Sequence, residues 1–361
     1  MIASGLLVDL SLHIDPAQLL AEGRLTQEEA AFRDLLLLGT FVYATLWSLY
    51  LGRPTSISAL VLSAVRRAAA NYDIGKTIRL WVELCFKMLD IIEILNGRSL
   101  EAPMEDSVIL SLSHLNTGLR FFFSGLPKSV TVDDAQVDEL DAEVYGPHLQ
   151  YCGIQIILHR AIIKSGQTSQ RQINLGGHNQ LPTLSTCYAI VHDNAMRIAR
   201  LILSFRRIFG LESMITIMMD AIYLAAVALT SHALRMQQEG RPIEREARWI
   251  RLLYETLEGV EKHFPVTAHM RSNLINVLEK TPLAYLFVDK FETSPNSLPE
   301  SMTSLPRFVP PDTAGFSGLG GPSLNASELM PGLDFTFTTQ DNFWLQDATW
   351  NGGPWLDELN V

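Results

Sequence analysis

The stretch from Thr26 to Pro54, TQEEAAFRDLLLLGTFVYATLWSLYLGRP, constrains the fold of this chain more than any other. Thr26 and Glu29 have the spacing of a capping box, in which each side chain bonds a free backbone amide of the first helical turn. At the other end, Gly52 suits the left-handed residue that follows a helix, and Pro54 cannot continue one. The sequence therefore predicts one long helix between these two ends.

The interior of this stretch is almost entirely apolar. Its polar residues are few: Arg33, Asp34, Thr40, Thr45 and Ser48. They leave no continuous solvent-exposed face beyond the first turns, so we expect a helix that is buried all round. The apolar run from Leu35 to Leu51 lacks the aromatic and basic flanks of a membrane helix, and no membrane span is expected. The helical spacing of its aromatic residues favours packing in the core over the alternative, the lining of a ligand cavity: Phe41, Tyr43, Trp47 and Tyr50.

The rest of the sequence up to residue 290 shows the same helical pattern. Apolar residues recur every three or four positions, and glycine or proline marks the joints. Helices are expected over residues 4–14, 57–71, 74–95, 108–123, 147–165 and 181–210. A further helix is expected to end at Gly240, the next to begin at Pro242, and the last to cover residues 266–287. Residues 129–143 are expected to form a loop, and residues 166–180 a linker. The predicted fold class is all-α, a large irregular helical bundle followed by a disordered C-terminal tail.

The composition changes sharply after Phe291. Residues 291–332 are rich in proline, glycine and serine, which predicts a disordered linker because such a segment buries too little apolar surface to offset its ordering entropy. Residues 333–361 mix aromatic and leucine side chains with acids and amides, which is typical of a disordered segment that folds on a partner. The sequence thus divides into a helical domain (1–290), a linker (291–332) and an acidic aromatic segment (333–361).

The charge distribution argues against direct nucleic-acid binding. The net charge is −11, and from Glu292 onward nine acidic residues stand against one base, Arg307. DNA affinity depends on clustered Lys and Arg, and no such cluster is present. The one basic stretch, residues 241–251, also contains Glu244 and Glu246 at helix-pair spacings, so we expect a salt-bridged helix face there.

Histidine and cysteine spacings predict no metal or redox centre. The nine histidines form no HExxH or comparable ligand pair, and we expect His159 to bond backbone carbonyls at the end of its helix. The three cysteines are widely separated, without a CxxC pair: Cys85, Cys152 and Cys187. They are expected to be reduced, and Cys187 to be a core residue.

Several short motifs follow one another along the chain. LLVDLSLHID occupies residues 6–15, LWSLYLGRPTSI residues 46–57, and HLQY followed by IILHR residues 148–160. Together with LP at 126–127 and CYAI at 187–190, they resemble the fungal-specific transcription factor domain, the helical regulatory region of binuclear zinc-cluster activators. The arrangement is most similar to nitrate-assimilation regulators. The signature positions are Trp47, Tyr50, Gly52, Arg53, Pro54, Tyr151, His159 and Arg160.

The sequence also departs from the family pattern. Phe32 precedes Arg33 where members often carry an Arg-Arg pair. Leu38 and Ala44 stand where tryptophan and aspartate are often found, and Ala161 replaces the proline after LHR. The zinc-cluster DNA-binding module that precedes this domain in the family is missing. We therefore expect an N-terminal truncation, with zinc only in the missing module and no cofactor in this chain.

The resemblance implies a nuclear transcriptional regulator of a fungal gene set, whose helical domain restrains or relays activation. The composition of the acidic aromatic segment independently predicts transactivation through the coactivator machinery, with the acids speeding encounter and keeping the aromatic residues solvated. The expected anchors are Trp344, Leu345, Trp350, Trp355 and Leu359.

Two other functions remain open. The chain could act without DNA contact, as a co-regulator or dominant-negative partner that forms a homodimer or heterodimer with a full-length zinc-cluster factor. The second open function is that of a helical magnesium-dependent enzyme. Asp133, Asp134 and Asp138 have the DDxxxD spacing that holds magnesium and a diphosphate in helical prenyl-transferring enzymes. The flanking residues lack helical amphipathicity and no second acidic motif follows, so we expect an acidic surface loop and no enzymatic activity.

Overall fold

The structure is a computed structural model, and it describes residues 7–8, 10–50, 52, 55, 57–71, 75–96, 105–132, 140–168, 182–279, 281 and 283. Within these residues the chain forms ten α-helices and one short 3-10 helix, with no strand. The expected all-α class is therefore confirmed. The linker and the acidic aromatic segment predicted from the sequence lie outside the described residues.

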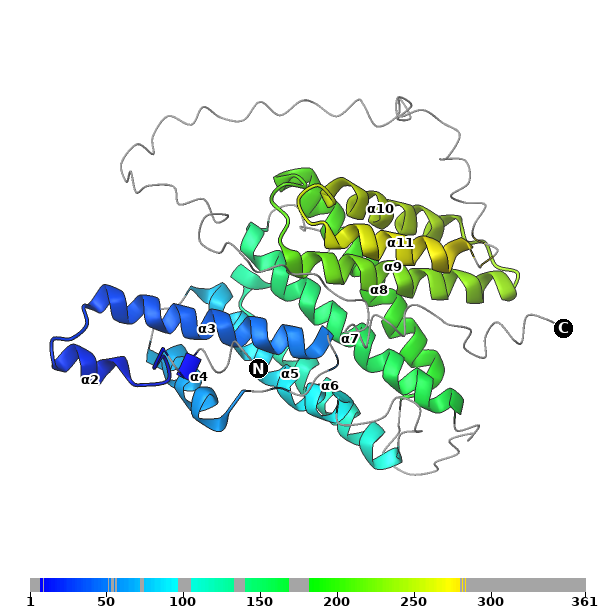
Figure 1. Cartoon of the computed structure of the whole chain (residues 1–361). Coiled ribbons are helices and arrows are strands. Elements are labelled where there is room, and N and C mark those ends of the chain that lie inside the picture. The colour runs from blue at the N-terminus through cyan, green and yellow to red at the C-terminus, as the bar shows by residue number, and fades with distance from the viewer. Residues whose placement is uncertain are drawn as a thin grey trace.

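The helices fall into two groups on either side of α7 (Figure 1). The first group is α2 (Pro16–Ala21), α3 (Gln27–Tyr50), α4 (Ala59–Asn71), α5 (Lys76–Asn96) and α6 (Asp106–Ser124), followed by the 3-10 helix η1 (Lys128–Val130). After α7 (Ala142–Thr168) come α8 (Leu184–Phe209), α9 (Thr216–Gln238), α10 (Glu244–Val260) and α11 (Val266–Glu279). Helix α7 packs against α5 and α6 from the first group and against α8 and α9 from the second, and so joins both into one core.

The ends of α3 are those that the sequence predicts. The backbone N–H of Thr26 donates to Glu29 Oε2 at 2.8 Å, and the N–H of Glu29 donates to Thr26 Oγ1 at 3.2 Å, which completes the capping box. Gly52 has a φ of 61°, in the left-handed region where glycine carries no steric penalty. These devices act between residues at most three positions apart, which is why the sequence alone predicts them.

The prediction that α3 is buried all round is wrong. Its inner face packs on α5, and the buried side chains include Leu37, Phe41 and Leu49. Its outer face exposes large apolar side chains, which are Phe32 (60%), Leu35 (45%), Leu36 (41%) and Tyr43 (53%). The reason is position: α3 packs against α2, α4 and α5 at the edge of the bundle (Figure 1), and the described elements leave its outer face uncovered.

Among the described residues, two helices, α3 and α9, are long and apolar enough to cross a membrane by length and composition alone. The apolar window of α9 is 78% buried inside the protein, as expected for a helix that contacts α7, α8, α10 and α11. That of α3 is 44% buried. This is weak evidence for a membrane span, because the core helix of a bundle passes the same test.

The start of α7 differs from the prediction. Residues 129–143 were expected to form a loop and the helix to begin at Pro147, but α7 begins at Ala142 and carries Pro147 inside it. Tyr145, in the segment before the proline, is fully buried and makes edge-to-face contacts with Phe205 and Phe209, at centroid distances of 5.2 and 6.0 Å. Packing of this aromatic anchor outweighs the one backbone hydrogen bond that the proline removes.

The N-terminal region also differs in detail. Of the helix expected over residues 4–14, only residues 7–8 are helical in the described part, and a turn with Ser11 at a φ of 54° follows. The sequence analysis missed α2, although Asp15 caps it by accepting from the N–H of Ala17 at 2.9 Å and Pro16 occupies its first position. Arg33 of α3 donates to the carbonyl of Ser11 at 2.7 Å and holds the turn in place.

Alanine substitutions at two helical glycines should have opposite effects on the free energy of unfolding. A Cβ on Gly146 of α7 would lie 2.7 Å from Cζ2 of Trp81, so we expect G146A to lower the free energy of unfolding by about 1–3 kcal/mol through overpacking. A Cβ on Gly118 of α6 meets nothing within 4 Å, so G118A should raise the free energy of unfolding by about 0.5–1 kcal/mol through helix propensity. Urea unfolding followed by circular dichroism measures both; stabilisation by G146A would contradict the close packing of α7 on α5.

Candidate functional site

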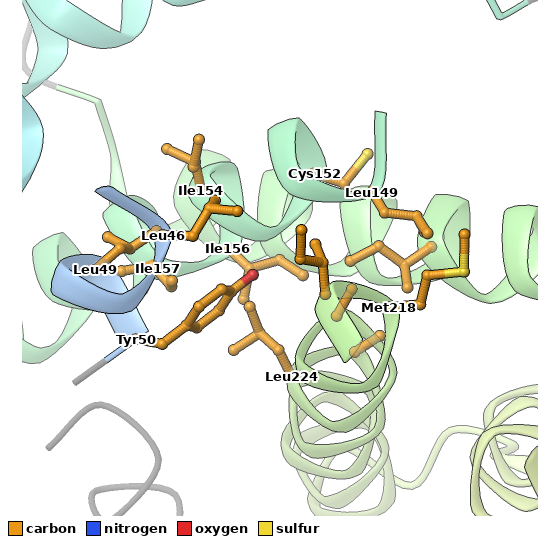
Figure 2. Packing of buried hydrophobic residues seen from close by; sticks show 14 of the residues in the cluster. Leu46, Leu49, Tyr50, Leu149, Cys152, Ile154, Ile156, Ile157, Met218 and Leu224 are labelled. Atoms are coloured by element: carbon orange, nitrogen blue, oxygen red, sulfur yellow. The ribbon is translucent and has the colours of Figure 1, made fainter. Parts of the chain in front are cut away.

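Two of the motifs that carry the family resemblance meet in the core. Tyr50, at the end of α3, donates from its hydroxyl to Oε1 of Gln150 in α7 at 2.7 Å, and both residues are buried. Figure 2 shows Leu46, Leu49 and Tyr50 gathered with Ile157 of α7 and Leu224 of α9. Burial raises the pKa of Tyr50 well above its ordinary value, so this phenol stays a neutral donor. The contact joins segments 100 residues apart in sequence.

His159 is part of a second buried polar group, between α6 and α7. Its Nδ1 lies 2.8 Å from the carbonyl oxygen of Gln155, and its Nε2 lies 3.4 Å from Nδ2 of Asn116. Gln155 Nε2 in turn donates to Asn116 Oδ1 at 2.8 Å. The expected carbonyl contact is present, but His159 lies inside α7 and not at its end. Burial lowers the pKa of His159, so the ring is a neutral structural bridge.

The other signature positions lie on or near the same helices. Tyr151 is partly buried and stacks on Phe123 of α6, with the ring centroids 3.8 Å apart. Trp47 and Arg160 are also partly buried, and Gly52 closes α3. Arg53 and Pro54 lie outside the described residues, as do Asp133, Asp134 and Asp138 and the five candidate coactivator anchors, Trp344, Leu345, Trp350, Trp355 and Leu359.

A cavity of about 460 Å³ lies beside Tyr151, among α6, α7 and α8. Arg120, Arg197 and His148 contribute to its lining. His148 Nε2 lies 2.8 Å from the carbonyl oxygen of Val130, and burial, with a smaller contribution from the charge of Arg197, lowers the pKa of His148 to about 4. This ring is therefore uncharged at neutral pH, and among the described lining residues the two arginines carry the positive charge.

Cys187 lies in the core, as the sequence predicts. Cys85, Cys152 and Cys187 are free and buried. Burial raises the pKa of the Cys187 thiol to about 11 and that of the Cys85 thiol further. Because the thiolate is the reactive form, these two are core residues with no nucleophilic role.

One cluster of potential metal ligands escaped the sequence analysis. His192 of α8, His232 of α9 and Glu246 of α10 each offer one ligand atom, and these atoms all lie within 4.8 Å of one another. The contact between His192 Nε2 and Glu246 Oε1 measures 3.5 Å, and the two imidazole rings lie with their centroids 4.0 Å apart. We call these three residues the His-His-Glu cluster.

The surroundings of the cluster are partly buried and cationic. Glu246 is 4% exposed, whereas both histidines are partly exposed. Burial, with contributions from His192, Arg235 and Arg241, lowers the pKa of His232 to about 4. Arg235 Nη2 lies 3.3 Å from His232 Nδ1, and its guanidinium lies over the ring of Tyr188 at 4.1 Å.

The sequence analysis missed this cluster because its members come from three helices and share no local spacing. The salt-bridged helix face expected over residues 241–251 does not include Glu246, which is buried and lies 3.5 Å from His192. A signal was available: Glu246 lies four and seven residues before Ile250 and Leu253, so it continues the buried stripe of α10. Helical periodicity thus places the carboxylate in the interior.

Comparison with known proteins adds no relative. No family model, no curated protein and no solved structure matches this chain. The likeness to fungal transcription factor domains therefore rests on the short motifs themselves.

Proposed function

We propose that this chain is the helical regulatory domain of a nuclear fungal transcriptional regulator, joined to an acidic aromatic activation segment. The observation that supports the proposal best is the buried hydrogen bond from Tyr50 to Gln150, because it joins two of the motifs on which the resemblance depends. The all-α architecture agrees with the family, whose regulatory region is helical.

In this proposal the helical domain restrains or relays activation, and the tail carries it out. The net charge of residues 292–361 is strongly negative and their aromatic residues are interspersed with acids, a composition that suits binding to a coactivator groove. DNA contact is supplied by another module or by a partner zinc-cluster factor, because the chain lacks the basic cluster that phosphate binding requires.

A reporter assay tests the activating role of the tail. Residues 292–361 fused to a heterologous DNA-binding domain should activate transcription, and alanine at the five anchors should abolish most of that activity: Trp344, Leu345, Trp350, Trp355 and Leu359. The matched control replaces five apolar residues of the linker and should retain activity: Leu305, Phe308, Val309, Phe316 and Leu319. Protein levels of all fusions are compared by immunoblot.

The same assay separates the alternatives. An inactive tail, or one indifferent to the anchor substitutions, would reject the activator role. It would favour the DNA-independent co-regulator, whose partner would then be sought by pull-down of a full-length zinc-cluster factor. A fusion of residues 1–361 that activates less than the tail alone would support restraint by the helical domain, whereas equal activity would argue against it.

A further inference from the structure

We infer that His192, His232 and Glu246 form a binding site for one divalent transition-metal ion of the zinc class, which links α8, α9 and α10. The inference stands on the convergence of three ligand atoms within 4.8 Å of one another, and it is independent of the proposed regulatory role. Two imidazoles and one carboxylate form a known three-ligand set for zinc that leaves a fourth position for water or another group.

The distances suit such an ion. Metal–ligand bonds of about 2.0–2.1 Å at tetrahedral angles separate neighbouring ligand atoms by about 3.3 Å. His192 Nε2 and Glu246 Oε1, at 3.5 Å, already have nearly that separation. The third atom lies within 4.8 Å of both, so the His232 ligand atom has to move inward by at most about 1.5 Å, which a change of side-chain torsion angles can supply.

The rings also have to reorient. Their planes now make an angle of 31° at a centroid distance of 4.0 Å, whereas an ion bound by both imidazoles lies in both ring planes. Arg235 donates to His232 Nδ1, so its guanidinium must withdraw if that nitrogen is the ligand. This side chain is 32% exposed, and its withdrawal gives up the stacking on Tyr188.

The buried carboxylate of Glu246 favours a cation at this place, against the opposing charges of Arg235 and Arg241. A buried carboxylate is costly unless it is paired or binds a metal. In the described part of the chain, the one basic side chain within 4 Å of Glu246 is that of His192, and its Nε2 makes no hydrogen bond at 3.5 Å. An ion between the three residues would pair the carboxylate and give this buried nitrogen a partner.

The donor types select the metal. Imidazole nitrogen suits zinc, copper, nickel and iron, while magnesium and calcium prefer oxygen ligands only. The cluster should therefore bind zinc-class ions and ignore magnesium. Because each ligand comes from a different helix, the ion would act as a clamp on the C-terminal half of the bundle.

The test uses the tag-free chain of 361 residues, stripped of metal with a chelator. Titration with Zn²⁺ in competition with a chromophoric chelator should show one site per chain and a raised melting temperature, and Mg²⁺ should show neither. Co²⁺ should give the strong visible absorption of a four- or five-coordinate site. H192Q, H232Q and E246Q should each weaken Zn²⁺ binding by at least about 100-fold, since loss of an outer-shell partner alone costs 10–100-fold.

Two further variants sharpen the result. H263Q alters an exposed histidine in the turn after α10 and should leave the affinity unchanged. R235Q removes a cation next to the site and should raise the affinity several-fold, the opposite sign to the ligand variants. Circular dichroism of the metal-free proteins checks folding. Weak binding that is equal in all variants, an adventitious ion only, would overturn the inference, as would a tight site that survives H192Q and E246Q.

Discussion

Replacing Tyr50 by alanine should lower the free energy of unfolding by about 3–5 kcal/mol, because the change removes a buried aromatic side chain and leaves a cavity. Tyr50 is 4% exposed and lies where α3, α7 and α9 meet. The substitution also deprives the buried Gln150 amide of its 2.7 Å hydrogen bond. Urea unfolding, followed by far-UV circular dichroism and tryptophan fluorescence, measures the loss.

The matched control lies on the same helix. Tyr43 is 53% exposed on the outer face of α3, and Y43A should change the free energy of unfolding by no more than about 0.5 kcal/mol. Y50F keeps the ring and removes only the hydroxyl, so it should cost about 1–3 kcal/mol through the unpaired Gln150 amide. Equal losses for Y43A and Y50A would contradict the orientation of α3.

Acidification should destabilise the protein through His148, and H148Q should remove that contribution. The pKa of His148 is about 4 when folded, below its ordinary value of 6.5, so between these values the unfolded chain binds the proton more tightly. The stability it contributes is fully present above pH 6.5 and is lost as the pH falls toward 4. The loss amounts to about 1.4 kcal/mol per pH unit, and to about 3 kcal/mol in total.

The measurement compares urea unfolding of the wild type and H148Q from pH 8 to pH 4.5. Glutamine can still donate to the Val130 carbonyl, and groups that titrate in both proteins, such as His159, cancel in the difference. The gap between the two free energies should be constant above pH 7 and should then shift in favour of H148Q as the pH falls. A gap that stays constant down to pH 4.5 would show that His148 accepts a proton in the folded state.

The start of α7 could not be predicted from the local sequence. The apolar spacing after Pro147 predicts a helix, and the proline suggests its start. The true start at Ala142 depends on Tyr145 packing against Phe205 and Phe209, residues about 60 positions away. Contacts at that separation are set by how helices pack, and a local pattern holds no information about them.

The candidate sites divide in the same way. The motifs around Tyr50 and His159 can be recognised in the sequence. The contacts that they make, from Tyr50 to Gln150 and from His159 and Gln155 to Asn116, depend on how the helices pack. The His-His-Glu cluster leaves no local motif, because its members are 40 and 14 residues apart on separate helices. Spacing rules detect ligand pairs on one helix, and they do not detect ligands that come together from several helices.

The sequence by itself determined the all-α class, both ends of α3 and the place of Cys187 on an apolar helix face, because capping and helical periodicity follow from neighbours within one or two turns. Only the tertiary structure decided which face of α3 is covered, that Pro147 lies inside α7, and that Glu246 faces two histidines in the interior. Each of these depends on which helices become neighbours, and that choice is made by the packing of the whole core.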